Sequence, residues 1–364
     1  MANERRRFIK AAGLAAAAAT IAKPAIAQSA PEIKWRLTSS FPKSLDTIYG
    51  GGEVLSKAVA EMTDGKFHIQ VFASGELVPG LQAFDAVQNN TVEMCHTSMQ
   101  YYWGKDPTFA IFTGIPFGPN ARQLNAWMYH GGGGELMAEF FKDYGALCLP
   151  GGNTGCQMGG WFRKEVKTIA DFSGLKLRIA GIAGKVLQKV GVVPQQIAAG
   201  DIYPALEKGT IDAAEWIGPY DDEKLGFYKV APFYYYPGWW EGATTTQFAI
   251  SLQKHAELPP AYQSALRSAA AFVNVDMMAK YDARNPAALK RLVGGGTKLL
   301  PFSAEIMDSC YKAAMELYAE YSATNEKFKK VYEAMAAFRN DEYLWFQLSE
   351  FTYDNFMIRQ RAKG

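Results

Sequence analysis

The chain has 364 residues, of which 49% are hydrophobic, 13% aromatic and 20% charged. This composition excludes a disordered chain and a collagen-like or coiled-coil repeat, and the length favours two lobes over one core. The formal net charge of +2 is too small to indicate a nucleic-acid partner, and the four cysteines form no CxxC pair typical of zinc or redox motifs.

Residues 1–27 have the three parts of an export signal: arginines at positions 5–7, an alanine-rich apolar stretch at 11–21 and an Ala-Ile-Ala cleavage site at 25–27. The arginines and the Phe-Ile-Lys that follows fit the twin-arginine pattern. A transmembrane anchor needs about 20 apolar residues, and Lys23-Pro24 interrupts this run. We therefore expect a twin-arginine signal peptide whose cleavage leaves a soluble periplasmic protein.

The oxidising periplasm permits disulfide bonds. Cys148 and Cys156 flank a glycine-rich turn and could pair with each other. Two free, buried thiols fit the sequence equally well, so the sequence leaves both alternatives open.

The first half of the mature chain predicts an α/β unit. Patterns of apolar residues predict strands at 33–37, 67–72 and 92–97 and helices at 54–62 and 81–89. Because strands and helices alternate along the chain, the three strands are expected to pair in parallel.

The same theme repeats further along the chain. The sequence predicts strands at 160–163, 175–179 and 213–217 and helices at 183–190 and 201–207, the second capped by its first residue, Asp201. A return strand is expected at 247–252. Two α/β units joined by crossing segments form a cleft, which is where α/β proteins bind ligands.

From Pro259 onward the chain is predicted to be helical. Ala265, Ala269, Phe272 and Val275 are expected to form one apolar stripe, and further helices are expected at 304–321 and 341–359. The last helix has apolar residues on more than one face: Tyr343, Leu344, Phe346, Leu348, Phe351, Tyr353 and Phe356. Such a helix must pack back on its own chain or be covered by a second subunit, and we favour a dimer.

Motifs that would indicate catalysis are absent. His130 and the four glycines after it look like the oxyanion loop of esterases, but the sequence has no GxSxG elbow, so a flexible turn is the better interpretation. The sequence contains no nucleotide-binding glycine motif, and its four histidines lack the spacing of a zinc site.

Some residues favour ligand binding instead. Arg178 ends a predicted strand and could hold a carboxylate through two parallel hydrogen bonds, although most such arginines are simply solvated. Aromatic residues could form the walls of a pocket, although each taken singly is more often part of a core: Tyr101, Tyr102, Trp103, Trp216, Trp239 and Trp240.

The segment Lys-Gly-Thr-Ile-Asp-Ala-Ala-Glu-Trp at 208–216 resembles a signature of substrate-binding proteins of tripartite ATP-independent periplasmic (TRAP) transporters. The arginine in the strand at 175–180 and the segment at 79–94 are also similar to that family. The resemblance covers essentially the whole mature chain and implies a two-lobed periplasmic-binding-protein fold of the α/β class, with a hinge. It further implies delivery of the ligand to a membrane permease.

Glu215-Trp216 together with Glu241 is similar to the branch of this family that binds 2-oxo monocarboxylates, such as pyruvate and 2-oxobutyrate, beside a metal ion. The resemblance assigns the ion to the two glutamates, the Trp216 carbonyl and Gln157. It assigns the ligand to these five residues: Arg178, Gln157, Tyr101, Tyr102 and Trp216.

Charge supports the ion once this placement is granted. Glu215, Glu241 and a bound carboxylate would place three negative charges beside the single positive charge of Arg178, and a bound cation removes this repulsion. All the proposed donors are oxygens, so we expect sodium, with calcium as the alternative.

We expect one lobe from residues 28–153 with 244–285, another from 154–243 with 286–338, and a dimerisation helix at 339–364 that is swapped between subunits. Three alternatives remain. The chain could be a TRAP receptor for lactate or another carboxylate, a periplasmic enzyme exported with its cofactor, or a structural protein that assembles through its last helix.

Overall fold

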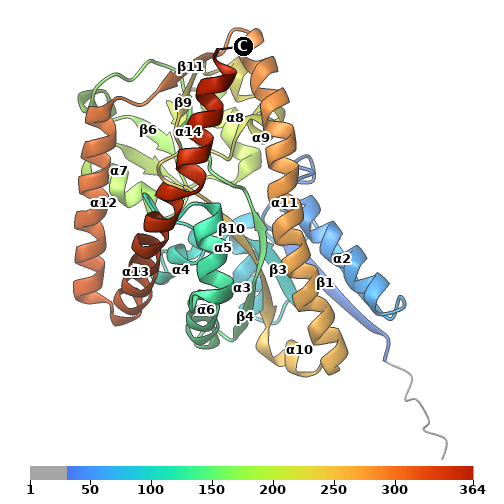
Figure 1. The fold of residues 1–364 in the computed structure, drawn as a ribbon. Coiled ribbons are helices and arrows are strands. Elements are labelled where there is room, and N and C mark those ends of the chain that lie inside the picture. Colours follow the sequence, from blue (N-terminus) through green and yellow to red (C-terminus); the bar gives the residue numbers. More distant parts are fainter. Residues whose placement is uncertain (1–30, 364) are drawn as a thin grey trace, which may run out of the picture. The chain divides into compact units, whose positions relative to one another are not determined.

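A computed structural model describes residues 31–363, so the predicted signal peptide at 1–27 lies outside the described residues. Figure 1 shows that the strands form two sheets and that helices pack around them. The α-helices are α2 (Gly50–Met62), α3 (Ala83–Gln88), α4 (Thr108–Ile111), α5 (Ala121–His130), α6 (Gly133–Lys142), α7 (Ala183–Lys189), α8 (Ala199–Glu207), α9 (Pro219–Leu225), α10 (Leu252–Ala256), α11 (Pro260–Gly294), α12 (Ala304–Thr324), α13 (Glu326–Leu348) and α14 (Glu350–Arg361). Short 3-10 helices are η1 (Gly80–Gln82), η2 (Met99–Tyr102), η3 (Ile169–Phe172) and η4 (Phe227–Lys229).

The first sheet has the strand order β2-β1-β3-β10-β4. Its strands are β1 (Ile33–Ser39), β2 (Phe67–Phe72), β3 (Met94–Thr97), β4 (Ala146–Asn153) and β10 (Thr245–Ser251). β1 pairs in parallel with β2 and β3, as predicted, whereas β10 runs antiparallel to β3 and β4. We call this sheet and the helices packed on it, among them α2, α3 and α6, the first lobe.

The second sheet has the order β11-β9-β5-β8-β6-β7. Its strands are β5 (Gly160–Phe162), β6 (Lys176–Arg178), β7 (Val193–Gln195), β8 (Ala213–Ala214), β9 (Phe233–Tyr236) and β11 (Lys298–Pro301). With α7 and α8, which pack on its strands, it forms the second lobe. The expected two-lobed α/β fold is confirmed, while the exact lobe boundaries stay a prediction.

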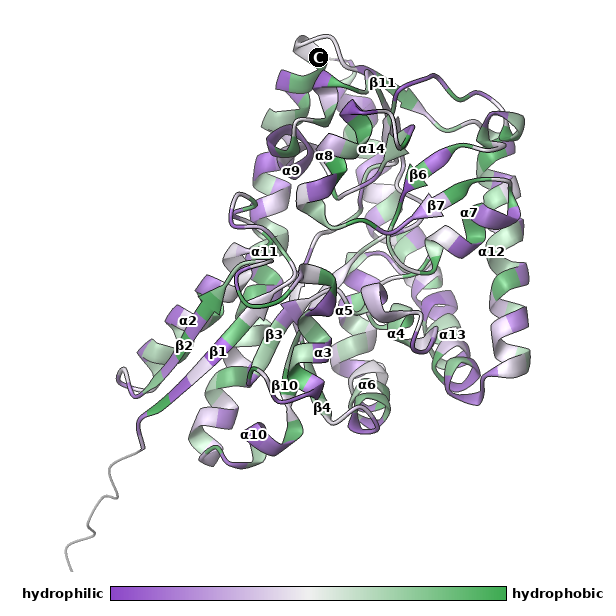
Figure 2. Cartoon of the chain, turned by 180° about the vertical axis from the view of Figure 1, so that it is seen from behind, coloured by the Kyte–Doolittle hydropathy of each residue, from purple (hydrophilic) through white to green (hydrophobic). Residues whose placement is uncertain are grey.

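The chain crosses between the lobes in two short segments, from β4 to β5 and from β9 to β10. Helix α11 also belongs to both lobes, because it packs on α2 and β4 of the first and on α9 of the second. Figure 2 shows hydrophobic and hydrophilic residues mixed along α11, as expected of a helix with one face in a core and another in solvent.

The stripe predicted on α11 is partly wrong. Ala265 and Ala269 are buried, but Phe272 is 56% and Val275 is 60% exposed. The buried face is centred on residues such as Leu266, and the predicted stripe drifts away from its edge as the helix turns.

The predicted helix at 341–359 is two helices. α13 ends at Leu348, and Ser349, with φ −91° and ψ −93°, separates it from α14. An ion pair between Arg122 and Glu350 holds the start of α14 near α5. Within residues 31–363, large apolar side chains of this region stay exposed: Tyr343, Leu344, Trp345, Leu348, Phe351, Tyr353, Phe356, Met357 and Ile358.

Three smaller points remain: a strand without a prediction, a predicted helix cap that is wrong, and a pair of cysteines for which the sequence left two alternatives open. Strand β4 was not predicted, because its Pro-Gly-Gly sequence indicates a turn. The side chain of Asp201 does not cap α8, which begins two residues earlier, at Ala199. Cys148, in β4, and Cys156 are both free, so the structure shows thiols rather than a disulfide, but only Cys148 is buried and Cys156 is exposed. No helix within residues 31–363 combines the length and the apolar character that a membrane span needs.

The correction on α11 gives the first testable prediction. We expect Leu266→Ala to lower the free energy of unfolding by about 2–5 kcal/mol, because it opens a cavity in a fully buried contact. Phe272→Ala, on the exposed face, should change it by less than about 0.5 kcal/mol. Urea unfolding measures both, and a Phe272→Ala cost equal to that of Leu266→Ala would contradict the observed helix face.

Candidate functional site

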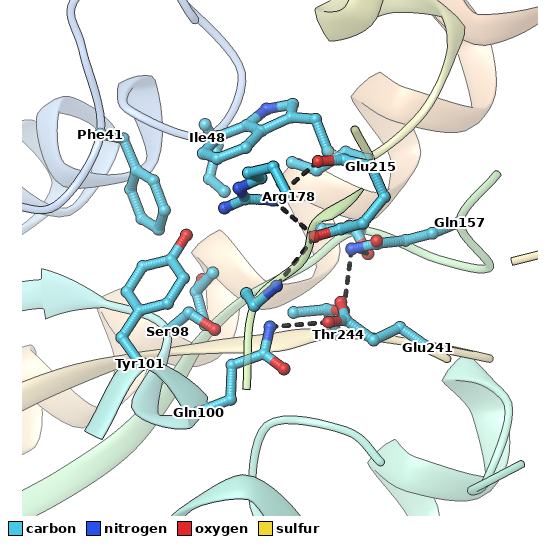
Figure 3. Close-up of a pocket in the computed structure, with 15 residues that line it drawn as sticks. Phe41, Ile48, Ser98, Gln100, Tyr101, Gln157, Arg178, Glu215, Glu241 and Thr244 are labelled. Atoms are coloured by element: carbon cyan, nitrogen blue, oxygen red, sulfur yellow. Dashed lines mark hydrogen bonds and ion pairs between the residues drawn. The ribbon is translucent and has the colours of Figure 1, made fainter. Parts of the chain in front are cut away.

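A small cavity lies where the two lobes meet. Its lining comes from the first lobe, the second lobe and both crossing segments (Figure 3). The lining residues are Phe41, Ile48, Ser98, Gln100, Tyr101, Thr154, Gln157, Arg178, Ala180, Glu215, Trp216, Ile217, Glu241, Thr244 and Thr246.

Parallel strands β6 and β8 place the central charges side by side. Arg178, the last residue of β6, lies in register with Ala214, the last residue of β8. β8 ends at Ala214, so Glu215 and Trp216 lie just beyond the sheet, where they line the cavity next to Arg178. This is the usual location of ligand sites, at the carboxyl ends of parallel strands.

Arg178 is 1% exposed, which contradicts the interpretation as a solvated arginine. Its Nη1 donates to the Glu215 carboxylate at 2.5 Å and to the Glu215 carbonyl at 2.7 Å, and its Nε donates to the Ile197 carbonyl at 3.1 Å. The guanidinium also lies over the ring of Trp216, 5.0 Å from its centroid. These contacts fix its orientation from both sides.

Glu241 lies in the segment that crosses from β9 to β10. Its carboxylate accepts a hydrogen bond of 2.7 Å from Nε2 of Gln100, in the first lobe, and another from the Thr244 hydroxyl. Gln157, in the other crossing segment, donates to the same Thr244 hydroxyl at 2.9 Å. The Oε1 atom of Gln157 is buried and has no hydrogen-bond partner in the described part of the chain.

The cavity holds more negative than positive charge. Burial raises the pKa of Glu215 above its ordinary value; Arg178 opposes this rise, and the nearby charge of Glu241 adds to it. Burial also raises the pKa of Glu241, although the hydrogen bonds from Thr244 and Gln100 lower it in part. Two carboxyl groups therefore share one guanidinium, and the site can gain stability by taking up a cation or a proton.

The first lobe contributes Tyr101, whose hydroxyl points toward Arg178 in Figure 3. Burial raises the pKa of this phenol, so it stays protonated and can donate a hydrogen bond. The backbone carbonyl of Tyr101 accepts a 2.9 Å hydrogen bond from Gln196 of the second lobe.

Six of the predicted site residues line this cavity: Arg178, Gln157, Tyr101, Trp216, Glu215 and Glu241. Tyr102 does not. Its hydroxyl accepts a hydrogen bond from the Phe84 amide at 2.9 Å and lies 3.3 Å from the Thr97 hydroxyl, inside the first lobe. Neighbouring residues of a 3-10 helix point about 120° apart, so only one of the two tyrosines can face the cavity.

The other aromatic candidates pack elsewhere. Trp239 stacks on Phe117, and Trp240 contacts Phe302, both in the core. Trp103 lies outside the cavity, with Lys185 over its ring.

Apart from Tyr101, sequence reasoning missed the first-lobe residues of the cavity, above all Phe41, Ile48, Ser98 and Gln100. Phe41 follows strand β1 and Ser98 follows β3, so the rule that ligands bind at strand ends could have found both. No motif marks Ile48 or Gln100.

Comparison with known proteins identifies the family of this chain. The family model of bacterial extracellular solute-binding proteins, family 7, matches residues 38–325. A monocarboxylate 2-oxoacid-binding periplasmic protein from Nostoc sp. is 49% identical over 90% of this chain and 89% of its own length.

Two solved structures are also similar. A TRAP transporter solute-binding protein from Bordetella bronchiseptica is 52% identical to this chain. The match spans 92% of this chain and 99% of that protein's chain, with a TM-score of 0.90. It is a mixed-occupancy dimer with calcium and picolinate in one active site. A TRAP periplasmic solute-binding protein from Pseudoalteromonas atlantica, with bound sodium and pyruvate, is 37% identical to this chain. The match spans 89% of this chain and 99% of that protein's chain, with a TM-score of 0.87.

These matches confirm the predicted resemblance, and the chain belongs to the bacterial extracellular solute-binding proteins of family 7, together with receptors of TRAP transporters.

Proposed function

We propose that this protein is a periplasmic TRAP receptor that binds a small 2-oxo monocarboxylate, such as pyruvate, together with a cation and delivers it to a membrane permease. The observation that carries the proposal is one buried guanidinium, Arg178, shared by two buried carboxylates in a small cavity. The named ligands of the relatives, 2-oxoacid and pyruvate with sodium, support this choice.

The ligand carboxylate is assigned to Arg178 and Tyr101. The hydrogen bonds of Arg178 to Glu215 and Ile197 use Nη1 and Nε, so Nη2 is left for the ligand, beside the Tyr101 hydroxyl. The side chains of Phe41 and Ile48 supply an apolar wall for the short carbon chain of the acid.

The cation is assigned to the carboxylates of Glu215 and Glu241, the Trp216 carbonyl and Oε1 of Gln157. The residues fit such an ion, because the carboxyl groups carry unbalanced charge and Oε1 of Gln157 is a buried oxygen without a partner. Residues 31–363 bring together no group of three or more His, Cys, Asp and Glu, so neutral oxygens must complete the set. Such a set suits sodium, which we propose, or calcium. When bound, the ion neutralises the carboxylates and attracts the keto oxygen.

We further propose that the ligand leaves chemically unchanged, so that the protein is a receptor and not an enzyme. The family is one of solute-binding proteins, which supports this. Incubation with pyruvate, followed by NMR of the acid, tests it directly, because any turnover would favour the enzyme alternative.

A homodimer through the end of α13 and α14 is also proposed. The exposed apolar side chains of this region would cost free energy in water, and a second copy is the occupant that would cover them. The Bordetella relative is a dimer, which supports the assignment.

The ligand assignment makes a prediction for melting experiments. Pyruvate at about 100 times its dissociation constant, with sodium present, should stabilise the protein by about 2.7 kcal/mol. Arg178→Gln should lose this effect, because the guanidinium assigned to the ligand carboxylate is gone. Thermal melting with pyruvate, lactate, succinate and glucose measures it.

Arg36→Gln is the matched control, since Arg36 pairs with Glu93 away from the cavity. Because Arg178→Gln leaves Glu215 unpaired, the double variant Arg178→Gln/Glu215→Gln provides a folded comparison. Equal stabilisation of the wild type and the Arg178 variants by pyruvate would contradict the assignment.

The buried carboxyls make a prediction about pH. Burial raises the pKa of Glu215 and Glu241, and that of Asp221 to about 7 and of Asp222 to about 6. A carboxyl whose pKa is higher in the folded protein than in the unfolded chain stabilises the fold when it is protonated. This contribution to the free energy of unfolding is complete below the unfolded-state pKa, near 4, and is lost as pH rises through the folded-state pKa. Unfolding experiments without ligand or cation should therefore show stability falling from about pH 5 to pH 8.

Sodium with pyruvate should reduce this slope, because the cation stabilises the ionised forms of Glu215 and Glu241. Glu241→Gln should also reduce it, whereas Asp221 and Asp222 should keep a residual slope. A wild-type slope that sodium and pyruvate leave unchanged would count against the cation site.

The dimer makes a separate prediction. Phe351→Lys, at an exposed position of α14, should raise the dimer dissociation constant at least tenfold, because it places a charge in the apolar contact. Met62→Lys, an exposed apolar position on α2, is the control and should leave it unchanged. Sedimentation velocity decides, and a wild type that is monomeric at micromolar concentration would remove the proposal.

A further inference from the structure

The loop at residues 40–49 joins β1 to α2 and forms the first-lobe side of the cavity. Phe41, near its start, and Ile48, near its end, both line the cavity. Between them, Asp46 contacts α9 of the second lobe.

Asp46 is the centre of a small polar cluster. Its carboxylate forms an ion pair with Lys224 and accepts hydrogen bonds of 3.1 and 3.2 Å from the Tyr220 hydroxyl, and both partners lie on α9. Nη1 of Arg284, on α11, donates to Asp46 at 3.2 Å and to the Thr47 hydroxyl at 2.7 Å. One first-lobe carboxylate thus connects to two cations and a phenol on other elements.

Both ends of this contact are close to the cavity along the chain. Asp46 is two residues from Ile48, and α9 begins two residues after Ile217, which also lines the cavity. The contact therefore holds the loop that carries Phe41 and Ile48 against the second-lobe segment that carries Trp216 and Ile217.

The cluster is only partly buried, since the side chain of Asp46 is 48% exposed and that of Lys224 is 30% exposed. Exposed ion pairs contribute little each and weaken with salt, so this cluster can break without unfolding either lobe. A contact of that strength suits a closure that must reopen.

We propose that Asp46 is a positioning residue for closure, which holds the 40–49 loop over the bound ligand and thereby sets the rate of ligand release. The ligand used to test it rests on the proposed function. Because the contact joins groups of both lobes beside the cavity, its loss should accelerate dissociation far more than it slows association.

The test is stopped-flow tryptophan fluorescence, because Trp216 lines the cavity. Observed rates against pyruvate concentration, at fixed sodium, give association from the slope and dissociation from the intercept. Asp46→Asn should raise the dissociation rate about three- to tenfold and change the association rate less than about twofold. Asp46→Glu should recover part of the loss.

Three comparisons separate a closure contact from a merely structural one. Lys224→Met should match Asp46→Asn, and the double variant should add little, because both remove one interaction. Asp143→Asn, which breaks an exposed ion pair to Lys327 elsewhere, should leave release unchanged. Raising the ionic strength with tetramethylammonium chloride should accelerate release from the wild type but not from Asp46→Asn.

An unchanged dissociation rate in Asp46→Asn would overturn the inference, as would an equal loss of melting temperature with and without pyruvate. If the wild type binds no 2-oxo acid, the proposed function fails. Small-angle scattering then tests, without a ligand, whether Asp46 holds the two lobes together. Asp46→Asn should then have a larger radius of gyration than the wild type at low ionic strength, and equal values would overturn the inference.

Discussion

The buried guanidinium of Arg178 is the interaction on which the site depends. It is enclosed by the Glu215 carboxylate, two backbone carbonyls and the ring of Trp216, so its charge is oriented before any ligand arrives. A charge held in this way loses little freedom when an anion binds, which is the advantage of a preorganised site. Arg178 is already paired with Glu215, so among residues 31–363 no second buried cation pairs with the other carboxylate, Glu241.

That imbalance links the ligand to the ion. An anion on Arg178 adds negative charge to a cavity that already holds two carboxylates, so anion and cation each favour the binding of the other. The two crossing segments supply Gln157 and Glu241, so the groups assigned to the ion lie where the lobes meet. Gln100 reaches Glu241 from the first lobe, so the proposed ion site and the contact between the lobes share residues.

The sequence was most informative where one rule decides the outcome. Alternation of strands and helices predicted the parallel pairing of β1, β2 and β3, and the signature at 208–216 located Glu215 and Trp216. The sequence misjudged features that depend on tertiary contacts. Phe272 lies outside the buried face of α11, whose centre only packing reveals, and β4 is a strand because β10 pairs with it despite its glycines.

In the site, too, the family pattern predicted some residues, and tertiary contacts decide the others. Six predicted residues meet in one cavity because the family pattern fixes them relative to two strands and two crossings. Tyr101 and Tyr102 are adjacent and chemically identical, so only the turn of η2 decides that Tyr101 faces the cavity. Ile48 and Asp46 belong to a loop without a motif, and their roles follow from the elements they contact.

Calorimetric titration of pyruvate into the cation-free protein at a series of sodium concentrations tests the central linkage most directly. If one ion binds with the acid, the logarithm of the dissociation constant should fall with the logarithm of sodium concentration, with a slope near −1 below saturation. The slope should approach zero in Glu241→Gln. A pyruvate affinity independent of sodium, and equally of calcium, in the wild type would contradict the account.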